Sequence, residues 1–106
     1  MIHIQIAEKN QECIKVTVKG HAGYAGEGQD IICAAVSILM VNTVNSIETF
    51  TEDDFTCDDG DGFMEITVDE EASPGTKLLM RSLCLGLEGI RQSYGDTFIQ
   101  IMTKEV

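Results

Sequence analysis

The sequence predicts a two-layer α+β sandwich, in which a mainly antiparallel sheet packs against two helices. Short segments of alternating apolar and polar residues indicate strands, longer segments with apolar residues at helical spacing indicate helices, and their chain order is ββα-ββα-β. A hairpin with one apolar face requires helices layered on that face. The 106 residues suffice for one compact core and not for two, so we expect a single domain over residues 1–106.

The first two strands are predicted from strict alternation near the start of the chain. The polar residues 8–12 between them suit a hairpin link, and Gly20 ends the pair. The apolar positions of the two strands are Ile2, Ile4 and Ile6, followed by Ile14, Val16 and Val18. We expect these side chains to share one face of the sheet.

A long helix is predicted over residues 31–50, which are apolar on nearly every side. Such a helix is either covered by other elements or forms a subunit interface. Asp30 is a suitable N-cap residue, and this cap would place Cys33 in the first helical turn. Residues 21–29 before it are rich in glycine and predict a flexible loop. The glycines of this loop are Gly23, Gly26 and Gly28.

The rest of the chain repeats the order of hairpin and then helix. Residues 55–68 predict a second hairpin, with its turn in the Asp- and Gly-rich segment 58–62. The Ser-Pro pair at 73–74 predicts the start of a second helix, with serine as the N-cap, and Gly95 predicts its end. Residues 97–102 predict a last strand.

The charge of the chain indicates which classes of partner this protein can bind. The chain has 18 acidic and seven basic residues, a net charge of −11, and there is no lysine or arginine between Lys19 and Lys77. Such a surface repels the phosphates of nucleic acids and anionic lipids, and it attracts basic proteins. A surface that serves solubility alone explains the same composition. We expect no nucleic-acid partner and no membrane partner.

Neither the first residues of the chain nor its cysteines point to secretion or to a metal. There is no uninterrupted apolar run long enough to span a bilayer, and the first residues lack the pattern of a signal peptide. Cys13, Cys33, Cys57 and Cys84 form no Cys-x-x-Cys pair and no spacing typical of zinc sites. We therefore predict a cytoplasmic protein with free thiols, no metal and no cofactor.

Cys33 and His21 are the residues that best account for chemistry. A cysteine in the first turn of a helix can have its pKa lowered from about 8.5 to roughly 3.5–7.5, because the helix dipole and unpaired N–H groups stabilise the thiolate. His21 would lie at the end of a strand, from which the glycine-rich loop could bring its imidazole to the thiolate. The unpaired N–H groups of the first turn, with that of Cys33 among them, would hold the oxyanion.

Each of these residues also has a simpler interpretation. A lone cysteine at the start of a buried helix is commonly a small core residue, and a lone histidine at a strand end is commonly a surface side chain. Asp30 either only caps the helix, or it also orients His21 or binds a basic substrate group. Ser37 lies one turn after Cys33 on the same face, where it forms a hydrogen bond near the site or only with its own helix.

Residues 20–37 resemble the bacterial ribosomal-processing cysteine protease family, called Prp. The family motif is a Gly-His-Ala segment followed, after a short glycine-containing loop, by G-x-D-[IV]-[IV]-C-A-A-x-S. The chain matches this motif with Gly20, His21 and Ala22, and then with Gly28, Asp30, Ile31, Ile32, Cys33, Ala34, Ala35 and Ser37. The length and the order of strands and helices also fit, so the resemblance covers the whole chain.

The resemblance implies a cysteine endopeptidase with a Cys33–His21 dyad that works through a thioester acyl-enzyme. It implies removal of a hydrophobic N-terminal extension from the precursor of a basic large-subunit ribosomal protein. Gly20, Asp30 and Ser37 would support the site or bind substrate, and Gly23, Gly26 and Gly28 would give the loop its flexibility. Members of the family look like homodimers, so the resemblance implies a homodimer.

A second hypothesis needs no chemistry. The acidic stretch 48–71 could belong to a non-catalytic binding module, which acts as a chaperone for a basic ribosomal protein. In that case alanine at position 33 would leave binding and biological effect unchanged. Incubation with a precursor peptide separates the two hypotheses, because only a protease yields shorter products.

Overall fold

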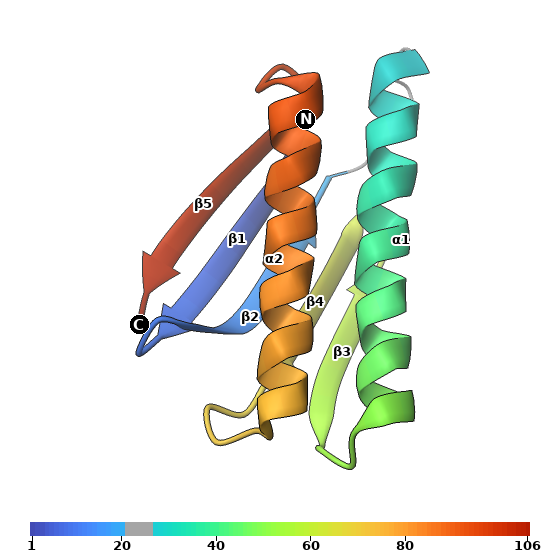
Figure 1. The fold of residues 1–106 in the computed structure, drawn as a ribbon. Helices are drawn as coiled ribbons and strands as arrows, with labels where there is room; N and C mark the ends of the chain where they lie inside the picture. Colours follow the sequence, from blue (N-terminus) through green and yellow to red (C-terminus); the bar gives the residue numbers. More distant parts are fainter. Residues whose placement is uncertain (21–26) are drawn as a thin grey trace.

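The computed structural model describes residues 1–20 and 27–106, of which residues 27–30 by their backbone only (Figure 1). The element order in this part of the chain is the predicted ββα-ββα-β. The elements are β1 (Ile2–Lys9), β2 (Glu12–Lys19), α1 (Glu27–Phe50), β3 (Phe55–Gly60), β4 (Phe63–Val68), α2 (Pro74–Tyr94) and β5 (Ile99–Glu105).

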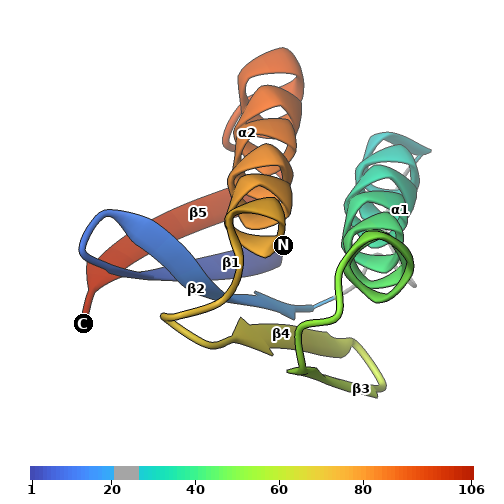
Figure 2. The ribbon, with the colours of Figure 1, turned by 60° about the horizontal axis from the view of Figure 1, so that its bottom comes forward.

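The strands form a single five-stranded sheet in the order β3-β4-β2-β1-β5. Three of its four pairings are antiparallel, and the pairing of β1 with β5 is parallel. Both helices lie on the same face of the sheet, as Figure 2 shows. The predicted α+β sandwich with a mainly antiparallel sheet is therefore confirmed.

The hairpin turns are tighter than the sequence predicts. The β1–β2 turn consists of Asn10 and Gln11, both with positive φ angles of 53° and 66°, as expected for a two-residue turn that matches the twist of the strands. In the second hairpin only residues 61–62 form the turn, because Asp58 and Asp59 pair with Glu65 and Met64 across the ladder. Backbone pairing therefore overrides the low strand propensity of the two aspartates.

Helix α1 begins at Glu27, so the prediction that Asp30 caps this helix is wrong. A single glycine inside a helix costs only about 1 kcal/mol relative to alanine, and Gly28 therefore does not stop the helix. Cys33 is the seventh helical residue and lies in the second turn, not in the first.

The core is formed between the sheet and one face of each helix. Its largest fully buried side chains are Ile2, Ile4, Ile32, Met40, Ile47, Ile66, Met80, Leu83, Leu87 and Ile99. In α1 the segment Ile31–Phe50 is long and apolar enough to cross a membrane by hydropathy, although polar residues interrupt it. In this fold Ile32, Met40 and Ile47 of this segment pack in the core. Core helices of soluble proteins pass the same hydropathy test.

Asp53 ties the end of α1 to the start of α2. Its carboxylate accepts hydrogen bonds from the backbone N–H of Ser73, at 3.0 Å, and from the hydroxyl groups of Ser73 and Thr76. These bonds lower the pKa of Asp53, and the bond from the Ser73 hydroxyl has the largest effect. The Ser73 oxygen also accepts from the Thr76 N–H, which confirms Ser73 as the N-cap of α2. This network aligns the two helices over the sheet.

Candidate active site

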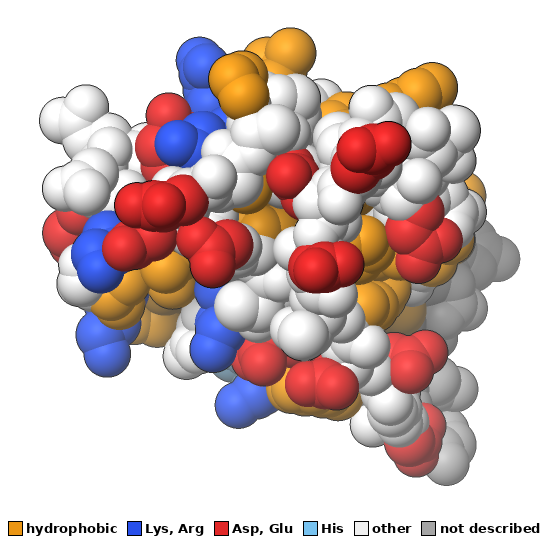
Figure 3. Space-filling view, turned by 90° about the horizontal axis from the view of Figure 1, so that it is seen from below, with side chains coloured by type: hydrophobic (Ala, Val, Ile, Leu, Met, Phe, Trp, Pro, Cys, Tyr) orange, Lys and Arg blue, Asp and Glu red, His pale blue; other side chains and the backbone are white. Residues whose placement is uncertain are grey.

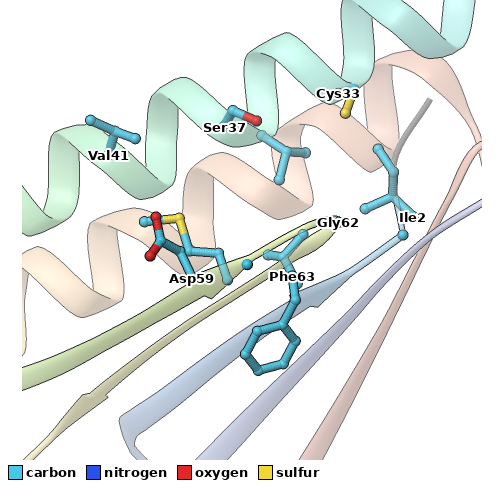
Figure 4. Close-up of a pocket in the computed structure, with 12 residues that line it drawn as sticks. Ile2, Cys33, Ser37, Val41, Asp59, Gly62 and Phe63 are labelled. Carbon is cyan, nitrogen blue, oxygen red and sulfur yellow. The ribbon is translucent and has the colours of Figure 1, made fainter. Parts of the chain in front are cut away.

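A groove with a volume of about 270 Å³ lies between α1 and the adjacent end of the sheet (Figure 4). Helix α1 forms one wall with Cys33 and Ser37. The other wall comes from Gly20 at the end of β2 and from the β3–β4 hairpin, which contributes Asp59 and Met64. The predicted site residues Gly20, Cys33 and Ser37 are therefore brought together in one groove.

Cys33 is half-buried, and its side chain packs against the edge of the core while it also lines the groove. Ser37 follows one turn later, about 6 Å along the helix axis, on the same face. The unpaired N–H groups of α1 belong to its first turn, residues 27–30, and the N–H of Cys33 lies inside the helical hydrogen-bond pattern. The prediction that first-turn placement stabilises the thiolate and lets Cys33 N–H hold an oxyanion is therefore wrong.

Gly20 occupies a position that requires glycine. Its φ angle is +92°, and a Cβ atom added there would lie 2.5 Å from the carbonyl oxygen of Met1. The N–H of Gly20 donates a hydrogen bond to the carbonyl oxygen of Gly62 at 2.8 Å. The end of β2 is thus held against the turn of the β3–β4 hairpin, at the groove that Cys33 lines.

The remaining predicted residues are only partly covered by the structure. His21, Gly23 and Gly26 lie outside the described residues. Gly28 lies by its backbone in the first turn of α1, so its predicted place in a flexible loop is wrong. Asp30 lies in the same turn, and its predicted role in the site stays a prediction. Within residues 1–20 and 27–106, no group of His, Cys, Asp and Glu side chains is arranged to hold a metal ion.

The other three cysteines differ from Cys33 in their surroundings. All four are free thiols in the structure. A hydrogen bond with Cys84 and burial raise the pKa of Cys13, which lies in the core. Cys57 is exposed on β3, where limited burial and then the carboxylates of Asp59 and Asp58 raise its pKa. None of these three thiols lines the groove.

The hairpin wall of the groove was missed by sequence reasoning. Asp59 belongs to a segment predicted as a turn, yet it lies on a strand and lines the groove. Alternation along residues 55–59 could have revealed it, because Phe55 and Cys57 occupy the same face of β3 as Asp59.

Comparison with known proteins assigns the chain to a family. A family model described as "Cysteine protease Prp" matches residues 1–100. The chain belongs to the Prp family. It is a cysteine peptidase, and the resemblance noted in residues 20–37 is confirmed. The ribosomal processing cysteine protease Prp of Bacillus subtilis is 32% identical over 83 residues, which are 73% of this chain and 74% of the relative.

The Prp proteins of Staphylococcus aureus are similar in sequence and in fold. One is 26% identical over 99 residues, which are 91% of this chain and 93% of that protein. A crystal structure of the S. aureus protease in complex with a substrate peptide superposes with a TM-score of 0.89 at 23% identity, covering 98% of this chain and all of the other. At this identity the superposition shows the Prp fold.

Proposed function

We propose that this Prp protein is an endopeptidase that removes the N-terminal extension of a large-subunit ribosomal protein precursor, with Cys33 as the nucleophile and His21 as the base. One observation carries the proposal. Cys33 and Gly20 line the same groove, and Gly20 is the residue that immediately precedes His21. Consecutive Cα atoms are about 3.8 Å apart, and this covalent link to a groove residue supports His21 as the base.

The proposed chemistry has two steps. The Cys33 thiol gives its proton to the imidazole of His21, and the thiolate sulfur attacks the carbonyl carbon of the scissile peptide bond. The carbon–nitrogen bond then breaks, the leaving amine takes the proton from the imidazolium, and a thioester remains on Cys33. Water then gives a proton to the imidazole and attacks the thioester carbon. The carbon–sulfur bond breaks, the carboxylic acid product leaves, and the Cys33 sulfur takes the proton back from the imidazolium.

The position of Cys33 in the helix makes the imidazole more important. The effect of a helix dipole falls off after the first turn, and Cys33 lies in the second. The proposed reaction therefore relies on His21 to take the proton of the thiol. We expect a cysteine that is reactive only when this histidine is present.

Two features support a basic ribosomal substrate. The relatives from S. aureus and B. subtilis are named ribosomal processing proteases, and the S. aureus enzyme has been crystallised with a substrate peptide. The surface of this protein is also strongly acidic: Figure 3 shows acidic side chains spread over one face, with the basic ones gathered toward one side. A net charge of −11 favours encounter with a basic partner.

The test is incubation of the protein with a peptide that spans the N-terminus of the ribosomal precursor, followed by mass spectrometry. We expect two product peptides whose masses sum to that of the substrate plus one water. A peptide that binds and stays whole would instead support the non-catalytic acidic module. Membership of a protease family favours cleavage.

Labelling with iodoacetamide tests the activation of Cys33. At pH 7 a thiol with a pKa near 8.5 is only about 3% ionised, and the raised pKa of Cys57 makes this exposed thiol a poor nucleophile. We therefore expect Cys33 to react about tenfold faster than Cys57, although Cys57 is more exposed. Timed labelling, read by peptide mass spectrometry, measures both rates.

The controls for labelling use the same chain. His21→Ala should bring the rate of Cys33 down to that of Cys57. Buried Cys13 should react only after denaturation. Equal rates at Cys33 and Cys57 in the wild-type protein would contradict the proposed dyad.

We further propose a homodimer that forms through α1. Ile31 and Ile38 are 55% and 67% exposed on this helix, and such large apolar side chains on one face favour burial between subunits. Light scattering should give twice the chain mass for the wild-type protein and a lower mass for Ile38→Glu. A wild-type monomer at micromolar concentration would rule the dimer out. Residence in the cytoplasm stays a prediction from the sequence.

A further inference from the structure

One position of β3 departs from the pattern of the helix-facing side of the sheet. Phe55, Cys57 and Asp59 are on this side, because their partners on β4 belong to the core or pack against it. These partners are Val68, Ile66 and Met64. Apolar residues are expected at such positions, and Phe55 fits. Asp59 instead places a carboxylate toward α1. Departures of this kind are typical of functional sites.

Among the described residues that line the groove beside Cys33, Asp59 is the only charged one. The rest of the lining is mainly apolar, with Val36 and Val41 on the helix and Met64 on the sheet. In the described part of the chain, Asp59 forms no ion pair. A carboxylate that stands in an apolar groove without a cation is suited to bind a cation from outside.

The position of Asp59 along the groove gives a distance from the nucleophile. Figure 4 shows Asp59 on the sheet side, below the stretch of α1 between Ser37 and Val41. These two residues lie one and two turns after Cys33, at about 6 and 12 Å along the helix. An extended peptide advances about 3.3 Å per residue, so this span corresponds to roughly two to four residues.

We propose that Asp59 is a specificity-determining residue, which binds a lysine or arginine side chain two to four residues from the scissile bond of the substrate. The inference rests on the proposed protease function and adds the class of residue that the groove selects. The aliphatic part of the lysine or arginine packs along Val41 and Met64, while its charged group meets the carboxylate. An acidic residue at the same substrate position is repelled.

Asp59 has a second possible role, which is to protect an edge strand from pairing with other chains. Charged residues on an edge strand hinder pairing with other chains, and β3 is an edge of the sheet. Asp58 provides the matched control, because it is the adjacent acidic residue and pairs with Glu65 on the opposite face of the strand. Asp59→Lys and Asp58→Lys change the net charge equally, but only Asp59→Lys changes the lining of the groove.

The experiment uses the precursor peptide with lysine or glutamate placed, one position at a time, at each of four residues on both sides of the scissile bond. We expect one position, two to four residues from the bond, at which the wild-type enzyme has a kcat/KM about tenfold higher for lysine than for glutamate. Asp59→Lys should reverse this preference, and Asp58→Lys should keep it. Cleavage without any preference, or an equal shift in both variants, would overturn the role of Asp59 and leave the protease function standing.

A binding measurement keeps the two proposals distinguishable. The same peptides are titrated into Cys33→Ala protein, with and without Asp59→Lys, and binding is followed by fluorescence anisotropy. A reversal of the charge preference in binding supports the role of Asp59 even if the active enzyme cleaves no peptide. The absence of cleavage would overturn only the proposed reaction. Binding that ignores the charge at every position overturns the role of Asp59.

Discussion

Cys33→Ala is expected to abolish cleavage of the precursor peptide, with a loss in kcat/KM of about 10⁴-fold or more, because no other described thiol lines the groove. His21→Ala should lower kcat/KM by about 10²- to 10⁴-fold, the range attributed to general acid–base catalysis. Rates are measured by mass spectrometry of the products. Circular dichroism should show both variants folded, since a half-buried cysteine contributes little packing volume.

The matched control for this pair is Cys84→Ala. Cys84 is also a half-buried helical cysteine at the edge of the core, but it lies on α2 and away from the groove. We expect this variant to keep wild-type kcat/KM within about twofold, because no group of the proposed reaction changes. A Cys33→Ala protein that cleaves as fast as Cys84→Ala would exclude Cys33 as the nucleophile.

Gly20→Ala is expected to reduce both stability and activity. A left-handed backbone costs a non-glycine residue about 1–2 kcal/mol, and the new Cβ would also collide with the carbonyl oxygen of Met1. Together these effects should lower the free energy of unfolding by about 2–3 kcal/mol, as measured by urea denaturation. Relief of the collision would shift the end of β2, so the folded fraction should also show a lower kcat/KM.

Gly95→Ala separates the two causes. Gly95 has a similar φ angle of +82°, but an added Cβ would meet no atom within 4 Å. This variant should lose only the backbone cost of the glycine-specific conformation at φ 82° and ψ 179°, about 1–3 kcal/mol, and keep full activity, because Gly95 ends α2 outside the groove. Wild-type kcat/KM in the folded fraction of Gly20→Ala would show that the contact with Met1 does not matter for the groove.

Much of the fold could be predicted from local patterns. Alternation along β1 and β2, the Ser73 cap and the Gly95 stop depend on interactions between near neighbours, and the structure confirms them. The start of α1 could not be located in this way. A cap residue such as Asp30 only favours a helix start, and the helix continues past it to Glu27 because one glycine costs little.

The motif of the candidate site is also local in part. Cys33 and Ser37 share a helix face through their spacing of four residues, and the residue types around them were enough to identify the family. Asp59 is different, because its place opposite α1 depends on which residues β3 pairs with on β4. A shift of one residue in that pairing would turn its side chain to the other face of the sheet.

The chain alone therefore indicated the order of its helices and strands, its acidic surface and the family to which it belongs, since neighbouring residues carry that information. The meeting of Gly20, Cys33 and Asp59 in one groove required the folded sheet, and so did the parallel pairing of β1 with β5. These features join residues that are distant in sequence. Their register follows from burial of apolar faces across the whole molecule, which no short stretch of sequence records.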